Sequence, residues 1–411
     1  MSKLKTEIIL GLNDQAWQLE LISNLNDQSN IVIRRRCVDA IDLISSVQSN
    51  KSTTIIISAD FSLLSLETIK HINQNNLKVI GVYLEDDLDQ FEKLKNLGVK
   101  FTQGINFKDV ETSALHLINS IESREELVTS NSSIPGLISI WGNSGAPGRT
   151  SVAINTAYCL AKTNRPTLLI DLDAVAPSIA SSLSIVSEIP GISSVIHDAM
   201  YGKLSKLNFD KNIVEVSSNL HVITGISNAK RWLELRTTGL IEVLKYASQN
   251  YAHIVCDLSP VLPDQIDKDK YDQGIFKRFD HIPKILELSS HIVYVMQANP
   301  LSLIRCNENL EILREFNSLD PFIVLNRVNA VYLGRKYENL VNDILLRWTK
   351  IDHIIKIEED IELFAKYWLK AQEVVFKENK EITNSFNQLK NYLINENFIA
   401  TKGIRKLKTA S

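Results

Sequence analysis

A glycine-rich turn between a predicted strand and a predicted helix carries the residue types best suited to chemistry. In the stretch ISIWGNSGAPGRTSVAIN, residues 138–155, an apolar run leads into three glycines, and Arg149, Thr150 and Ser151 follow. Glycine lets the backbone turn several amide N–H groups toward one anion, and the dipole of the next helix favours negative charge there. The stretch therefore predicts a phosphate-binding loop.

This loop departs from the usual pattern GxxxxGK followed by Ser or Thr. Asn143 stands at the first glycine, and Arg149 stands at the lysine. Guanidinium is a planar fork and ammonium a compact charge, so the replacement changes how phosphate is held. The residues that we expect to bind phosphate are Gly145, Ala146, Pro147, Gly148, Arg149, Thr150 and Ser151. The alternative is a turn that caps a helix without binding any ligand.

Three carboxylates end two further apolar runs. Asp171 and Asp173 end the run PTLLIDLD, and Asp257 ends the run AHIVCDL. In open α/β sheets, ligands bind at the carboxyl ends of the strands, and Mg²⁺ prefers oxygen ligands. A single acid at the end of a strand is as often a helix cap as a ligand-binding residue. Together with the loop, the three acids predict an Mg-nucleotide site in which Thr150 adds a hydroxyl ligand.

The chain that must position these residues reads as two α/β series. Residues 1–128 alternate five short apolar runs with helical patterns, which predicts a parallel sheet covered on both faces. The polar segment 129–133 is the expected linker, 134–400 the second domain, and 401–411 a basic tail. The predicted fold class is therefore α/β, with two three-layer domains.

Bulk composition narrows the classes of protein. The chain has 411 residues, of which 44% are hydrophobic and 23% charged, and its net charge of −3 argues against a general nucleic-acid binder. Its four cysteines lack paired spacing and are expected to be buried, reduced thiols. No apolar run is long enough to span a bilayer, so we expect a cytoplasmic protein, with peripheral contact at the inner face of the plasma membrane still open.

The motifs resemble the ParA/MinD group of P-loop ATPases, of the SIMIBI class. SGAPGRT, Ser144 to Thr150, occupies the positions of that group's deviant loop, KGGxGK followed by Thr or Ser. Asp171 and Asp173 match its second acidic motif, and Asp257 its Walker B aspartate. The run FIVLNRV matches the strand whose asparagine, here Asn326, contacts the nucleotide base.

The resemblance implies a slow ATPase that acts as an ATP-linked homodimer. It implies ATP and Mg²⁺ as cofactors, Asp173, Arg149 and Asp171 as catalytic residues, and Thr150, Asp171 and Asp257 as metal ligands. Asp173 is expected to orient the attacking water and Asp171 to lie nearer the metal, although the two roles are interchangeable. The resemblance implies that the group's signature lysine reaches the partner's phosphates across an ATP-linked dimer. That lysine is Ser144 here, and Arg231 and Arg236 are the candidates to replace it.

Within the group, the sequence is most similar to actinobacterial CpaE/TadZ-like members, which join an atypical receiver domain to the ATPase. GAPGRTS and residues 223–236, ITGISNAKRWLELR, carry this likeness. In the receiver-like part, Ser58 holds the phosphoacceptor place, Asp60 falls two residues late, and Asp14 alone represents the acidic pair. A docking module is therefore expected there.

The implied role is a localisation switch for pilus or secretion assembly, with a protein partner at a pole, septum or secretion complex. A MinD-like regulator of division-site placement is one alternative. A non-catalytic scaffold that binds nucleotide is another, because Ser144 and Arg149 replace the family's lysines.

Overall fold

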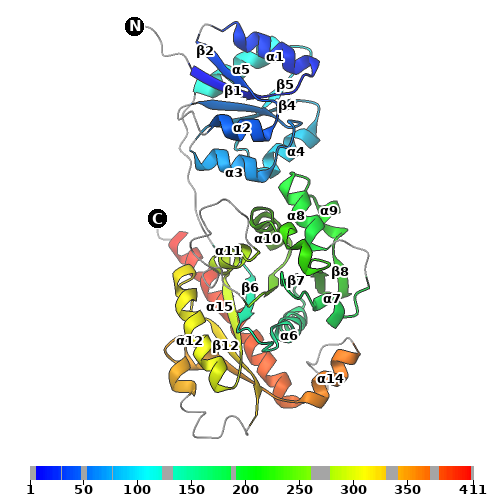
Figure 1. The fold of residues 1–411 in the computed structure, drawn as a ribbon, viewed down its shortest axis with the longest axis vertical. Coiled ribbons are helices and arrows are strands. Elements are labelled where there is room, and N and C mark those ends of the chain that lie inside the picture. The colour runs from blue at the N-terminus through cyan, green and yellow to red at the C-terminus, as the bar shows by residue number, and fades with distance from the viewer. Residues whose placement is uncertain are drawn as a thin grey trace. The chain divides into compact units, whose positions relative to one another are not determined.

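The structure is a computed structural model that separates into two compact units (Figure 1). It describes residues 6–28, 30–47, 53–75, 77–122, 133–186, 191–260, 278–329, 341–370 and 379–408. The first unit comprises Met1–Ser130 and His197–Asn208, and the second comprises Asn131–Ile196 and Phe209–Ser411. Most of the expected linker, residues 129–132, lies outside the described residues, and the domain limits read from the sequence stay a prediction.

In the first unit, five strands alternate with five helices, as the sequence predicts. The elements are β1 (Thr6–Gly11), α1 (Ala16–Asn26), β2 (Ile31–Arg36), α2 (Ala40–Val47), β3 (Thr54–Ser58), α3 (Leu66–Gln74), β4 (Val79–Leu84), α4 (Leu88–Asn96), β5 (Phe101–Ile105) and α5 (Val110–Glu122). All the strand pairs are parallel, in the order β2-β1-β3-β4-β5. This is a doubly wound order that places ligands at the carboxyl ends of β1 and β3.

The core of this sheet follows from the alternation of side chains along each strand. Ile8, Leu10 and Ile56 point to one face, where they pack against Trp17 and Leu21 of α1 and against the apolar side of α5. Helices α2 and α3 contact each other, and α4 contacts β4 and β5. Both faces of the sheet are covered.

The second unit is larger. Its elements are β6 (Leu137–Gly142), α6 (Arg149–Ala161), β7 (Thr167–Leu172), α7 (Ile179–Ser182), α8 (Ile192–Met200), α9 (Lys206–Asp210), β8 (Val214–Ser217), β9 (Leu220–Ile223), the 3₁₀ helix η1 (Ala229–Glu234), α10 (Thr237–Asn250), β10 (His253–Leu258), α11 (His281–Leu288), β11 (His291–Gln297), α12 (Pro300–Phe316), β12 (Phe322–Val328), the 3₁₀ helix η4 (Ile351–His353), β13 (Ile354–Glu358), α14 (Ile361–Leu369) and α15 (Lys380–Lys408). The segment His197–Asn208, which holds the end of α8 and the start of α9, is counted with the first unit.

The strands of this unit form one sheet in the order β13-β12-β11-β6-β10-β7-β9-β8. Every pair is parallel except β8 with β9. The six apolar runs of the sequence form β6, β7, β9, β10, β11 and β12, and the edge strands β8 and β13 were not predicted. The α/β fold class with mainly parallel sheets is confirmed.

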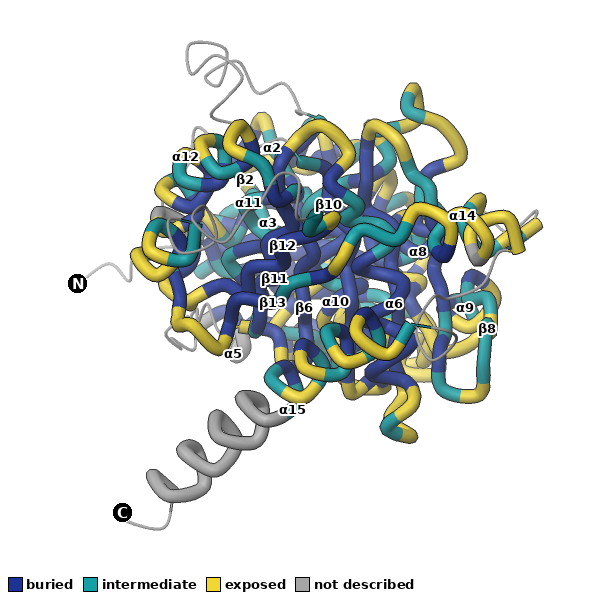
Figure 2. Tube along the Cα trace, turned by 90° about the horizontal axis from the view of Figure 1, so that it is seen from below, coloured by how far each residue is buried: buried dark blue, intermediate teal, exposed yellow. Residues whose placement is uncertain are grey.

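Helices cover both faces of the second sheet. Ile138 and Ile140 of β6 face α6 and α15, whereas the hydroxyl of Ser139 lies 2.7 Å from that of Ser289, at the end of α11. Helices α10, α11 and α12 pack along this second face. From Val152 to Ala161 every residue of α6 is buried, and the central strands are dark blue in Figure 2. The loop before α6 is therefore held by a rigid core.

The thiols match their expected state. Cys37, Cys159, Cys256 and Cys306 are all free and buried. Among the described residues, no helix has both the length and the apolar character that crossing a membrane requires.

Candidate functional site

The glycine-rich loop connects the end of β6 to the start of α6, and its backbone has the form that an anion site needs. Gly145, Ala146 and Gly148 all have positive φ, at 92°, 53° and 92°. Alternation of such residues with ordinary ones turns successive N–H groups toward one side. A Cβ atom on Gly148 would lie 2.4 Å from Nδ2 of Asn326, so only glycine fits at that position.

Asn143, which replaces the first glycine of the usual pattern, anchors the loop in the interior. It is buried, and its Nδ2 donates a 2.7 Å hydrogen bond to the carbonyl of Ser302 on α12. The hydroxyl of Tyr294 donates to Asn143 Oδ1 and accepts from Asn309 Nδ2 at 2.8 Å. The departure from the pattern thus attaches the loop to β11 and α12, which the sequence did not reveal.

The first turn of α6 brings a hydroxyl onto the Walker B acid. Thr150 Oγ1 donates a 2.6 Å hydrogen bond to Asp257 Oδ2 and lies 3.1 Å from the hydroxyl of Ser178. Thr150 and Asp257 are therefore in direct contact. Ser178 follows β7 and was not singled out in the sequence, although a hydroxyl soon after a strand-end acid is a usable signal.

Asp171 and Asp257 occupy the same register position on the adjacent strands β7 and β10. Parallel neighbours lie about 4.8 Å apart, so the two buried carboxyls share one small space. Asp171 Oδ2 accepts from the backbone N–H of Ser178 and Ile179, at 2.8 and 3.0 Å. These donors fix its orientation toward the loop side.

Burial raises the pKa of Asp171 to about 7. Burial first, and then repulsion from Asp171, raises the pKa of Asp257 to about 8. Two carboxyls that resist joint ionisation in this way are stabilised by a divalent cation placed between or beside them.

Asp173 is held in a tight turn after β7. Its Oδ1 accepts from the backbone N–H of Val175 and Ala176, at 2.8 and 3.0 Å, and from the hydroxyl of Ser259 at 2.8 Å. Ser259 in turn accepts from the N–H of Ala174 at 2.9 Å. The second acidic motif and the end of β10 are thereby linked through Ser259, which the sequence analysis missed.

Arg149 is engaged by the protein itself. Its Nη1 donates to the carbonyl of Asn143 at 2.6 Å, and its Nε donates to the carbonyl of Leu258 at 3.1 Å. Its Nη2 lies 3.7 Å from Asp173 Oδ2, and both side chains are nearly buried. The sequence led us to expect Arg149 along the β and γ phosphates, whereas here its guanidinium ties the loop to β10 and the acidic turn.

The end of β12 presents two residues to the loop through a break in the strand register. Pairing with β13 shifts between Leu325 and Val328, and Arg327 has φ 55°. Asn326 is buried and its Nδ2 donates a 2.7 Å hydrogen bond to the carbonyl of Pro147. Such an irregularity stores local strain and is common at functional sites.

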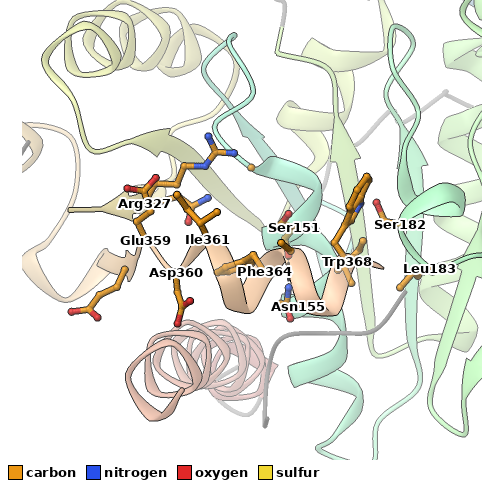
Figure 3. A pocket seen from close by; sticks show the side chains of 15 residues that line it. Ser151, Asn155, Ser182, Leu183, Arg327, Glu359, Asp360, Ile361, Phe364 and Trp368 are labelled. Carbon is orange, nitrogen blue, oxygen red and sulfur yellow. Dashed lines mark hydrogen bonds between the residues drawn. The ribbon is translucent and has the colours of Figure 1, made fainter. Parts of the chain in front are cut away.

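Beside the loop lies a cavity of about 460 Å³, a size suited to a nucleoside-sized ligand. Apolar side chains from α6, α14 and the end of α7 line one part of it, and Asn326, Arg327 and the acids after β13 line the other. The lining residues are Gly148, Ser151, Ile154, Asn155, Ser182, Leu183, Asn326, Arg327, Glu358, Glu359, Asp360, Ile361, Phe364, Ala365 and Trp368. In Figure 3, Trp368 and Leu183 lie toward one end and Arg327 and Glu359 toward the other.

The oxygen ligands of the site fit Mg²⁺ in combination with a phosphate. Thr150, Asp171 and Asp257 offer a hydroxyl and two carboxyls at one sheet edge. Across the described residues, no group of three or more His, Cys, Asp or Glu side chains could hold a metal by itself. Mg²⁺ characteristically takes one or two carboxylates and completes its shell with water and substrate phosphates. The arrangement can therefore serve an Mg-nucleotide.

Comparison with known proteins gives a family-model match and several structures of similar fold. Residues 136–266 match the model of a family described as an AAA domain. The ParA family ATPase from Chlorobium tepidum is 16% identical, with a TM-score of 0.51 over 62% of this chain and 98% of that one. No curated protein matches the sequence.

Two MinD structures have similar sequence identities and TM-scores. The cell division ATPase MinD of Pyrococcus furiosus is 18% identical, with a TM-score of 0.49 over 63% of this chain and 98% of that one. MinD of Pyrococcus horikoshii, complexed with Mg-ADP, is 17% identical, with a TM-score of 0.49 over 62% and 95%. At such identities the likeness concerns the fold. The Chlorobium structure therefore shows a shared fold, and the family-model match covers less than half of this chain.

Proposed function

We propose that this protein is an Mg-dependent ATP-binding protein that hydrolyses ATP slowly and acts as a localisation switch. One observation carries the proposal. The hydroxyl of Thr150 donates a 2.6 Å hydrogen bond to Asp257, directly after a glycine-rich loop that borders a 460 Å³ cavity. A turn that only capped a helix would need neither the paired carboxyls nor the adjoining cavity.

In this proposal the nucleoside of ATP fills the cavity, and the backbone N–H groups of Gly145 to Ser151 hold its phosphates. Asn326 lies beside the base, as the resemblance implies, while Thr150 and Asp257 hold Mg²⁺ with Asp171 close by. When bound, the ion neutralises charge that develops on the phosphates. Asp173 orients the attacking water, and Arg149 contacts the phosphates after leaving its internal partners.

Tryptophan fluorescence tests the binding step directly. Trp368 lines the cavity and is 65% exposed, so an ATP molecule in the cavity changes its surroundings. We expect MgATP to alter the emission of the wild type with a saturable dose dependence, and expect Trp368→Phe to lose most of that change. Calorimetry on both proteins separates loss of the reporter from loss of binding. Absence of heat with saturating MgATP for the wild type would overturn the proposal.

A non-catalytic scaffold that binds nucleotide is the second candidate. The internal contacts of Arg149 with Asn143 and Leu258 favour it, because they leave no free basic side chain within the loop. Phosphate release by the wild type, Asp173→Ala and Arg149→Ala separates the two candidates. Slow release by the wild type, reduced in both variants, supports the ATPase. Binding without release supports the scaffold, and equal release from all three indicates contamination.

For the cellular role we propose CpaE/TadZ-like positioning of a pilus or secretion assembly, through an ATP-linked homodimer and a protein partner. The first unit supports this choice, because its strand order β2-β1-β3-β4-β5 suits the atypical receiver module of such proteins. A MinD-like role at the division site is the alternative. A fluorescent fusion tests the roles: polar foci favour the first, and septal accumulation favours the second. Light scattering with Mg²⁺ and a non-hydrolysable ATP analogue tests the dimer.

A further inference from the structure

The proposed phosphate site lacks one positive charge that its chemistry needs. Ser144 stands at the position of the signature lysine, and a serine hydroxyl cannot neutralise the charge of a triphosphate. Arg149, the basic residue of the loop, is held by Asn143, Leu258 and Asp173. Even if Arg149 turns to the phosphates, the charge of the signature lysine is still missing, and a cation beside the loop would supply it.

Arg305 of α12 lies where such a cation is needed. A Cβ atom built on Gly145, the residue that follows Ser144, would lie 3.7 Å from Nη1 of Arg305. The side chain is half-buried, and it forms no hydrogen bond, ion pair or ring contact with any residue that the structure describes. The guanidinium donors of Arg305 are therefore available to a ligand.

The start of α12 is tied to the same loop, so the position of Arg305 is set by packing. Asn143 donates to the carbonyl of Ser302, and Asn309 donates to the hydroxyl of Tyr294, which itself donates to Asn143. Ser302 and Asn309 lie one turn before and one turn after Arg305 on the helix. The loop and the arginine are therefore parts of one rigid assembly.

Other basic residues are less suited to this role. Arg231, an alternative suggested by the sequence, pairs with Glu234 at 2.5 Å on η1. Arg327 lines the cavity, among residues expected to surround the nucleoside. Arg305 alone among these lies beside the first half of the loop.

We infer that Arg305 binds the outer phosphates of the nucleotide held by its own chain and supplies the positive charge that Ser144 does not. Guanidinium presents several donors in a planar fork and can contact two phosphate oxygens at once. This inference rests on the proposed function. It assigns α12 a part in distinguishing a triphosphate from shorter ligands.

Calorimetry with ATP, ADP and adenosine, each with Mg²⁺, tests the inference in the full-length protein. Arg305→Met keeps the apolar stem and removes the charge. We expect this variant to bind ATP about 10- to 100-fold more weakly, ADP less affected, and adenosine unchanged, because charged hydrogen bonds to phosphate are lost. Arg305→Lys should lose less affinity for ATP than Arg305→Met. The measurements are made at protein concentrations where scattering shows a monomer.

A matched control and a rescue make the result specific. Arg314→Ala removes another arginine of α12, one that stacks on Trp348 at 4.3 Å and donates to the carbonyl of Arg347. It should leave all three affinities within about twofold. Adding Ser144→Lys to Arg305→Met should restore ATP affinity only at concentrations where scattering shows a dimer, because the resemblance implies that a lysine at this position reaches the phosphates bound by the partner.

The outcomes separate the inference from the function on which it rests. If wild type binds ATP and Arg305→Met binds it equally, Arg305 has no such role and the proposed function survives. An equal loss for adenosine and ATP would show a structural effect and would also overturn the inference. If the wild type binds no nucleotide, both fail together.

Discussion

The carboxyl edges of the two sheets both carry aspartates, but the groups around these aspartates differ. In the first unit Asp60 follows β3, and its carboxylate accepts from Gln15 Nε2 at 2.7 Å and from Gln18 Nε2 at 3.0 Å. Asn13 Nδ2 donates to the backbone carbonyl of the same residue at 2.9 Å. Amide side chains therefore surround the acid nearest to the expected phosphoacceptor place, and the ammonium of Lys93 donates a 2.6 Å hydrogen bond to the adjacent carbonyl of Ala59.

At the carboxyl edge of the second sheet, two carboxyl groups lie next to each other. Asp171 and Asp257 are buried next to each other, and burial raises the pKa of both. At the first edge Asp14 pairs with Arg36, and Ser58, at the acceptor place expected from the sequence, is fully buried. An acid at the end of a strand is thus a candidate cation ligand only where the surroundings leave its charge unsatisfied.

The largest expected difference between the edges concerns Mg-nucleotide binding. Asp257→Asn keeps the shape of the side chain but removes a carboxylate beside Thr150, so MgATP should bind about 100-fold more weakly, or about 2.7 kcal/mol. Asp60→Asn, the same chemical change at the other edge, should leave the affinity within about twofold. Calorimetry measures both. Equal losses would show that the two edges do not differ in the way described.

Next in size is a dependence on pH at the second edge. A carboxyl whose pKa is raised by folding stabilises the fold fully below its unfolded value of 3.8, and this contribution is lost as pH rises through 7 to 8. Without nucleotide, Asp257→Asn should therefore raise the melting temperature relative to wild type more at pH 9 than at pH 5. Affinity for MgATP should rise over the same interval.

A difference in melting temperature between Asp257→Asn and wild type that stays constant from pH 5 to pH 9 would contradict this expectation.

A smaller effect is expected from the buried anchor of the loop. Tyr294→Phe removes a hydroxyl that donates to Asn143 and accepts from Asn309, so the free energy of unfolding should fall by about 1–2 kcal/mol. Urea denaturation measures this loss. Asn309→Ala, which removes the other partner, should show strong non-additivity in the double variant. Additive losses would argue against a single connected cluster.

The smallest effect should come from the amides of the first edge. Gln18 is fully buried, and its Oε1 has no hydrogen-bond partner in the described part of the chain. Gln18→Met removes one donor to Asp60 and also removes that unsatisfied oxygen, so the two consequences oppose each other. We expect a change in unfolding free energy of less than about 1 kcal/mol by urea denaturation. A larger loss would mean that Asp60 depends on this amide.

Much of the architecture could be predicted from the sequence, because apolar runs and helical periodicity determine which segments are strands and which are covering helices. The five strands of the first unit and the six apolar runs of the second were found in this way. β13, Ile354–Glu358, was missed because the residues after it are charged and continue into a helical pattern. β8, Val214–Ser217, was missed because an edge strand with little burial has no continuous apolar run.

The candidate site was only partly accessible to the same reasoning. Spacing located Thr150, Asp171, Asp173 and Asp257, which the fold brings to one sheet edge. It could not foresee that Arg149 binds carbonyls of the loop and of β10, since backbone acceptors leave no trace in a side-chain pattern. The places of Ser259 and Arg305 depend on contacts between segments far apart in the chain, which local sequence does not encode.

The contact of Thr150 with Asp257 has a consequence for kinetics. The hydroxyl and the carboxylate already lie 2.6 Å apart, so these two ligands need no rearrangement of the chain before an ion binds. Departure of a proton from the crowded carboxyl pair is then the slow event. Metal association followed by stopped-flow should accelerate with buffer pH and should show little sensitivity to solvent viscosity.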